Sequence, residues 1–262
     1  MPLTPLSGSL KTLLIRGLLA GLIAGLLAGG VAFLLGEPHV DAAIAIEEQN
    51  AAAEAHDHAA ETTGGHSHDE EDALVSRDGQ KGGLFLATAL AGLALGAIFA
   101  AVAHYARRFM GLSGPILAIS LATAGWLAIE AVPFFKYPAN PPAVGDPDTI
   151  NKRTLLWLSA VLLGLAAVAI AAYVSKVVQA QQFTVRLVAP LGAFLVVVGL
   201  GYVLLPGVNE VGDDFPATLL WEFRLSSLAT QATLWISLGI AFAFLTELAD
   251  RQKSATQTLA SR

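Results

Sequence analysis

The sequence predicts an all-α protein, a polytopic bundle of about six transmembrane helices. Only 14% of its 262 residues are charged and the mean hydropathy is +0.62, whereas soluble domains carry about 25% charged residues. The apolar residues also gather in long blocks, unlike the alternating or heptad patterns of soluble folds. Helices are favoured over barrel strands because a helix satisfies its backbone hydrogen bonds within its own segment.

Six apolar blocks reach the roughly 20 residues needed to cross a hydrocarbon core of about 30 Å. The predicted spans are approximately Leu13–Leu35, Gly82–Tyr105, Leu112–Phe135, Leu155–Val178, Leu187–Leu205 and Leu228–Leu248. The first block could alternatively be a cleaved signal peptide, but the apolar region of such peptides is only about 7–15 residues long. We therefore expect it to remain as the first helix.

The basic residues predict that both termini lie in the cytoplasm. With six crossings, nine of the fifteen Lys and Arg fall on the side of the termini, and cytoplasmic loops are enriched in these residues. Eighteen of the twenty-one acidic residues fall in the loops on the other side. The expected divisions are 1–36, a cytoplasmic N-terminus and first helix; 37–81, an acidic outer loop; 82–248, the other five helices; and 249–262, a cytoplasmic tail.

The outer loop contains the most specific chemical signal. A short amphipathic stretch is expected near Ala42–Glu54, whereas Ala55–Asp72 has no apolar residue larger than alanine and should be disordered without metal. Two His-x-His pairs and nearby carboxylates could bind one divalent ion, and imidazole-plus-oxygen sites suit Co²⁺, Ni²⁺, Zn²⁺ or Cu²⁺. The candidate metal ligands are His56, Asp57, His58, His66, His68 and Asp69. A solvated acidic linker is the alternative interpretation.

Glu130 is the candidate for a role in translocation within the membrane, near the outer end of the third block. An intramembrane carboxylate costs several kcal/mol unless it is paired, hydrated or protonated, and its expected partner is a cation. Pro133 would free a backbone carbonyl near residue 129. The alternative is a structural ion pair with Lys136.

The loop after the third block contains four prolines between residues 138 and 148. Prolines oppose regular structure and keep the chain extended and stiff. This loop could present Asn140 and Asp146 at an outer vestibule, or it could be a rigid connector.

Glycines recur every fourth residue in the first two blocks, at Gly17, Gly21, Gly25 and Gly29 and at Gly92 and Gly96. Such stripes allow helix backbones to pack closely in lipid.

Three segments together resemble the CbtA family of probable cobalt transporter subunits, and the likeness extends over most of the chain. They run from Gly36 to Glu47, from Val75 to Leu84 and from Lys136 to Asp146. The resemblance implies cobalt uptake, about five membrane spans and a small companion membrane subunit, CbtB. It implies Co²⁺ as the transported ion; we expect no permanently bound cofactor.

Together these features predict a multi-pass protein of the cell membrane that captures a divalent transition-metal ion, with cobalt implied by the resemblance, in the outer loop and passes it inward. The expected partners are the lipid bilayer, the metal ion and a companion subunit. The alternative is a membrane metal sensor or accessory protein that conducts nothing. An enzyme is not expected because no His-Glu-x-x-His motif is present, and no phosphate-binding motif is found. Nucleic-acid binding has no support.

Overall fold

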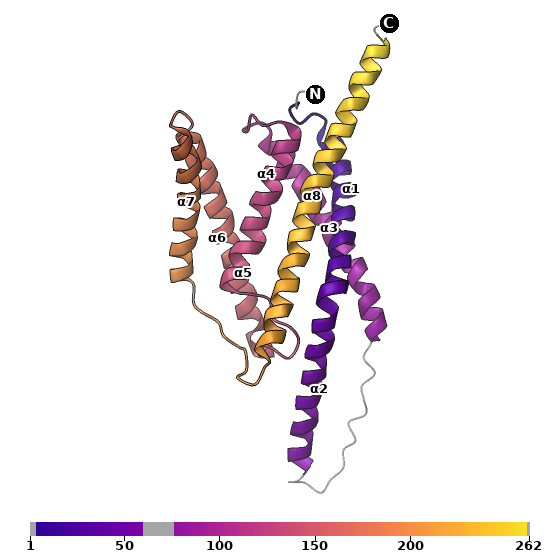
Figure 1. Cartoon of the computed structure of the whole chain (residues 1–262), viewed down its shortest axis with the longest axis vertical. Helices are drawn as coiled ribbons and strands as arrows, with labels where there is room; N and C mark the ends of the chain where they lie inside the picture. Colours follow the sequence, from indigo (N-terminus) through magenta and orange to yellow (C-terminus); the bar gives the residue numbers. More distant parts are fainter. Residues whose placement is uncertain (1–3, 60–75, 261–262) are drawn as a thin grey trace.

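The computed structural model describes residues 4–59 and 76–260, and this part of the chain is helical without a strand (Figure 1). The elements, in chain order, are α1 (Leu10–Val31), η1 (Ala32–Gly36), α2 (Glu37–Ala59), α3 (Arg77–Ala106), α4 (Gly114–Trp126), η2 (Leu127–Ala131), α5 (Val132–Lys136), η3 (Pro147–Thr149), α6 (Ile150–Val177), α7 (Phe183–Leu204) and α8 (Ala217–Ala260).

Six helical stretches in the described residues are long and apolar enough to span a membrane, which confirms the predicted helix count. It is one more than the number expected from the family resemblance. Five of these six helices begin earlier than predicted, and α8 differs most, since it begins at Ala217 instead of Leu228. Both α3 and α6 begin five residues early, at Arg77 and Ile150. Hydropathy marks only the apolar part of a helix, and these helices continue through polar residues beyond it.

The first helix does not end at the predicted boundary. α1 continues through the single π turn η1 into α2, which ends at Ala59. The stretch expected to be disordered from Ala55 therefore begins within a helix, which corrects that part of the prediction. Residues 60–75, which include the rest of the stretch up to Asp72, lie outside the described residues.

The glycine stripes allow close helix packing, as predicted, and the structure shows that they bring α1 and α3 into backbone contact. A Cβ atom added to Gly21 would overlap the carbonyl oxygen of Gly92, and one added to Gly17 would overlap that of Gly96. Helix α8 packs against both α1 and α4, while α6 and α7 form a hairpin that joins the bundle through contacts of α6 with η2 and α5. Gly164 of α6 allows this second close approach, because a Cβ there would overlap the Ala128 carbonyl oxygen.

Both chain termini lie at one end of the bundle, called here the terminal end (Figure 1). The N-terminal segment is fixed there by Arg107, which donates hydrogen bonds to the carbonyl oxygens of Leu6 and Gly8 at 3.2 and 2.9 Å. Thr4 and Ser7 donate to the carboxylate of Asp250 on α8 at 2.9 and 2.8 Å. The opposite end, called the distal end, carries α2 and the loops that precede α6 and α8 (Figure 1).

Candidate functional site

The predicted metal ligands of the outer loop fall in two parts of the chain. The backbone of α2 includes residues 56–58, and therefore His56, Asp57 and His58. His66, His68 and Asp69 lie outside the described residues. Among the residues that are described, no group of three or more His, Asp or Glu is arranged to hold a metal ion. Metal capture by this loop therefore stays a prediction.

Acidic residues at the base of the same loop are already paired. Arg77, at the start of α3, forms ion pairs with Glu37 and with Asp41, the latter at 2.7 Å. Lys81 also pairs with Asp41 at 3.0 Å. These contacts fix the start of α2 to the start of α3, and they neutralise part of the negative charge that the sequence places on this side of the membrane.

Glu130 lies on η2, a π turn in the distal half of the span formed by α4, η2 and α5. The N–H of Val132 bonds to the carbonyl oxygen of Leu127, five residues back. Single π turns inside helices occur frequently at functional sites. The Glu130 carboxylate is partly buried, and its Oε1 accepts a hydrogen bond from Trp235 Nε1 on α8 at 3.4 Å. This places an acidic group inside the span, at the contact with α8.

The alternative prediction, a structural ion pair between Glu130 and Lys136, is wrong. Lys136 Nζ donates instead to the backbone carbonyl oxygen of Tyr202 on α7 at 2.9 Å. The Tyr202 hydroxyl in turn donates to the carbonyl oxygen of Val132. Lys136 thus joins α5 to α7, and among the described residues no cation pairs with Glu130.

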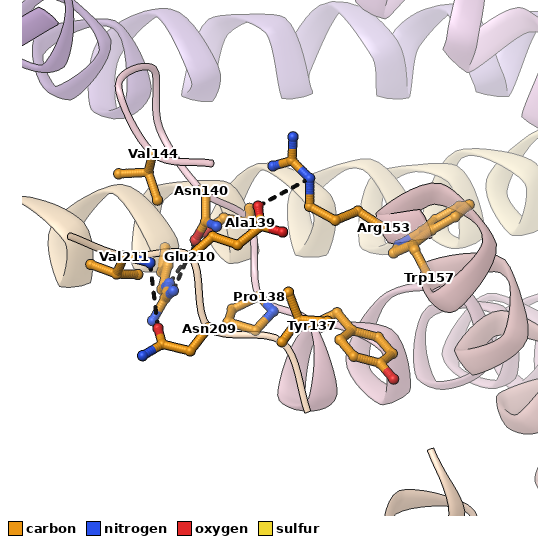
Figure 2. A pocket seen from close by; sticks show the side chains of 12 residues that line it. Tyr137, Pro138, Ala139, Asn140, Val144, Arg153, Trp157, Asn209, Glu210 and Val211 are labelled. Atoms are coloured by element: carbon orange, nitrogen blue, oxygen red, sulfur yellow. Dashed lines mark hydrogen bonds and ion pairs between the residues drawn. The ribbon is translucent and has the colours of Figure 1, made fainter. Parts of the chain in front are cut away.

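A cavity of about 270 Å³ lies at the distal end, between the loop before α6 and the loop before α8 (Figure 2). Both loops and the first turns of α6 and α8 contribute to it. Its lining residues are Tyr137, Pro138, Ala139, Asn140, Val144, Arg153, Trp157, Val208, Asn209, Glu210, Val211 and Arg224.

The structure places Asn140 in the cavity lining and Asp146 beside it, and both have partners within the protein. Asn140 Oδ1 accepts a hydrogen bond from Arg224 Nη2 at 2.9 Å, and Arg224 Nε donates to the Ala139 carbonyl oxygen at 3.2 Å. Asp146 Oδ1 caps the 3₁₀ turn η3 by accepting from the Asp148 N–H at 2.9 Å. The two predicted oxygen donors therefore serve the loop's own structure, and an arginine occupies the position expected for a cation.

A second arginine, Arg153, joins the two loops from the other side. Its Nη2 donates to the Asp146 carbonyl oxygen at 3.3 Å, and its Nε lies 3.4 Å from Glu210 Oε2 (Figure 2). Gly145 has a φ of +116°, and a Cβ there would overlap the Arg153 guanidinium. The loop conformation is thus fitted closely around this side chain.

Sequence reasoning missed Arg153, Glu210, Arg224 and Trp235. Arg224 contacts residues about 84 positions earlier in the chain, and Trp235 contacts a residue 105 positions away. No local motif reports such pairings. The one available signal was Arg224 itself, an arginine inside a mainly apolar helical stretch, where charged residues require a partner.

In the described residues, six helices long and apolar enough to span a membrane, a buried glycine contact and a carboxylate within one of these helices define a multi-pass helical membrane protein. Comparison with known families makes the assignment specific. The chain belongs to the CbtA family, described as probable cobalt transporter subunit, which matches residues 10–247. This description is that of a transporter subunit. No curated protein and no solved structure matches the chain.

Proposed function

We propose that this membrane subunit carries Co²⁺ inward across the cell membrane, with the histidine-rich outer loop capturing the ion and Glu130 contributing to its route. The orientation that this requires has both termini in the cytoplasm and the distal end outside. The observation that carries the proposal is the Glu130 carboxylate, held inside a membrane span on a π turn and facing α8 without a paired cation in the described chain. Ionisable residues within membrane spans are rare and mark substrate or ion pathways.

The energy for inward transport is available without a nucleotide-binding motif in this chain. A divalent cation moving inward through a potential of 100 mV gains about 4.6 kcal/mol, twice the value for a single charge. A facilitated pathway would therefore suffice to accumulate the ion. The family description as a subunit supports a companion membrane chain, and we expect it to complete the pathway.

Uptake of labelled Co²⁺ into vesicles that contain the purified chain tests conduction directly, with Ni²⁺ and Zn²⁺ measured in parallel. The orientation is tested in cells by labelling Ser67→Cys with a reagent that does not cross membranes. Labelling in intact cells supports the proposal. Labelling only after the cytoplasmic face is opened contradicts it.

A metal sensor or accessory protein that conducts nothing is the second candidate. The observation that favours it is the small number of polar side chains in the described core, where the buried ones are Arg16, Ser226 and Thr246. Arg16 lies near the terminal end, where its Nη1 donates to the Ser7 carbonyl oxygen at 3.5 Å. Metal binding without uptake, both in vesicles and with the companion subunit present, would support this candidate.

A further inference from the structure

The distal cavity carries a positive charge that a cation pathway does not explain. Its lining contains two guanidinium groups, from Arg153 and Arg224, and one carboxylate, from Glu210. The two arginines come from different helices, α6 and α8, and both reach the space between the loops. The lining side chains carry a net charge of +1, which favours an anion over a divalent cation within the cavity.

Hydrogen-bond donors remain available on both arginines. A guanidinium has five N–H groups, but Arg224 donates only from Nε and Nη2, and Arg153 only from Nη2, to other described residues. Arg153 Nε makes no hydrogen bond within the described chain, but it forms an ion pair with Glu210 Oε2 at 3.4 Å. The Nη1 groups of Arg153 and Arg224 make no hydrogen bond to described residues, so they can donate to an oxygen acceptor in the cavity.

The rest of the lining suits an organic molecule more than an inorganic ion. Trp157 and Tyr137 contribute aromatic surface, and Val144 and Val208 contribute aliphatic surface. The Tyr137 hydroxyl is already used, since it donates to the Pro206 carbonyl oxygen at 2.8 Å. Small-molecule sites combine such apolar walls with a few convergent polar groups. A cavity of about 270 Å³ has room for a small molecule.

We propose that this cavity binds a small organic anion with two or more carboxylate groups, held by the guanidinium groups of Arg153 and Arg224. Arginine binds carboxylates with paired N–H donors, and such charge-assisted hydrogen bonds are about twice as strong as neutral ones. The carbon skeleton lies against Trp157 and the valines. This site is independent of the ion that the protein transports.

Citrate, without added metal, is the probe, and the purified full chain in detergent is the sample. Binding is followed by tryptophan fluorescence, to which Trp157 contributes, and by the thermal unfolding midpoint at constant ionic strength. Wild type should show a saturable change with citrate. Trp157→Phe should lose most of the fluorescence change and keep the rise in the unfolding midpoint.

Two isosteric variants give opposite expectations because they change the cavity charge in opposite directions. Asn209→Asp adds a negative charge and still offers an oxygen to the Val211 N–H, now 3.4 Å from Asn209 Oδ1. It should weaken citrate binding by about tenfold or more. Glu210→Gln removes a negative charge and should strengthen it. For a cation site, Asn209→Asp should strengthen binding of the cation and Glu210→Gln should weaken it.

Arg153→Met should abolish saturable binding, whereas Lys152→Met is the matched control. Lys152 is its neighbour on α6 and does not line the cavity. If Arg153→Met does not fold, Asn209→Asp and Glu210→Gln decide the question. Citrate binding that is unchanged in both of these variants overturns the proposal, as does the absence of saturable binding to wild type. Sulfate binding as tightly as citrate overturns the assignment to an organic anion.

Discussion

Replacing Glu130 with glutamine keeps the side-chain volume and removes a charge from within a membrane span. The structural cost should be small, below about 1 kcal/mol, because glutamine still offers an oxygen to Trp235 Nε1 and no ion pair is broken. The loss of attraction for a passing ion is larger than this structural cost. A divalent cation about 4 Å from a carboxylate gains roughly 8 kcal/mol at an effective dielectric constant near 20, twice the value for two unit charges.

Dehydration of the ion and the carboxylate offsets part of this attraction. If half remains, about 4 kcal/mol is lost in Glu130→Gln, which corresponds to nearly a thousandfold in rate. We therefore expect Co²⁺ uptake to fall by about a hundredfold or more, with protein abundance and the thermal unfolding midpoint close to wild type. Reconstituted vesicles with labelled Co²⁺ give the initial rate.

Glu222→Gln is the matched control, since it makes the same change on α8 where the side chain is 52% exposed. Its uptake should match wild type. Full uptake by Glu130→Gln would refute the reasoning. Loss of folded protein in Glu130→Gln would point to a structural role, and Lys136→Met should not restore it, because Lys136 contacts Tyr202 and not Glu130.

Four further outcomes are expected. Gly21→Leu should separate α1 from α3 and lower stability by about 1–3 kcal/mol, whereas Gly30→Leu should have little effect because no neighbour lies within 4 Å of a Cβ there; the thermal unfolding midpoint measures both. Arg224→Met removes two hydrogen bonds to the loop before α6 and should cost about 1–3 kcal/mol, with faster proteolysis of that loop. Replacing the four histidines between residues 56 and 68 with alanine should slow uptake when Co²⁺ is scarce and leave the maximal rate nearly unchanged. Wild-type metal binding should fade below about pH 6, since protonated imidazole does not bind metal.

The helical class and the spans could be predicted because lipid imposes a length and a composition on every crossing segment. The glycine stripes also predicted a contact correctly, since the same residues that allow close approach are visible as a period of four. The predicted helix starts at Leu155 and Leu228 were late because polar first turns carry no hydropathy signal. The disorder predicted from Ala55 relied on composition alone, and α2 continues to Ala59.

The candidate sites were less predictable. Glu130 stands out in the sequence because a carboxylate inside an apolar block is rare, but its partner Trp235 depends on how α8 packs. Pro133 suggested an irregular backbone near residue 129, and the structure has a π turn at Leu127–Ala131. The arginines at the distal end were counted only as topology signals. Their role at the cavity depends on two loops that meet only in the folded chain.

The uninterrupted helix from Leu10 to Ala59 also sets a distance. At about 1.5 Å per residue it is roughly 75 Å long, whereas the hydrocarbon layer is about 30 Å thick. Helix α2 therefore forms a rigid projection, and its last residue, Ala59, lies roughly 35 Å from its first, Glu37. Counter-ions screen charges over about 8 Å at physiological salt. The electrostatic potential of an ion bound at the end of α2 therefore does not extend to the membrane surface. If the outer loop captures the ion as proposed, capture and entry at the membrane surface are separate events, and the ion has to be released and to diffuse between the two positions.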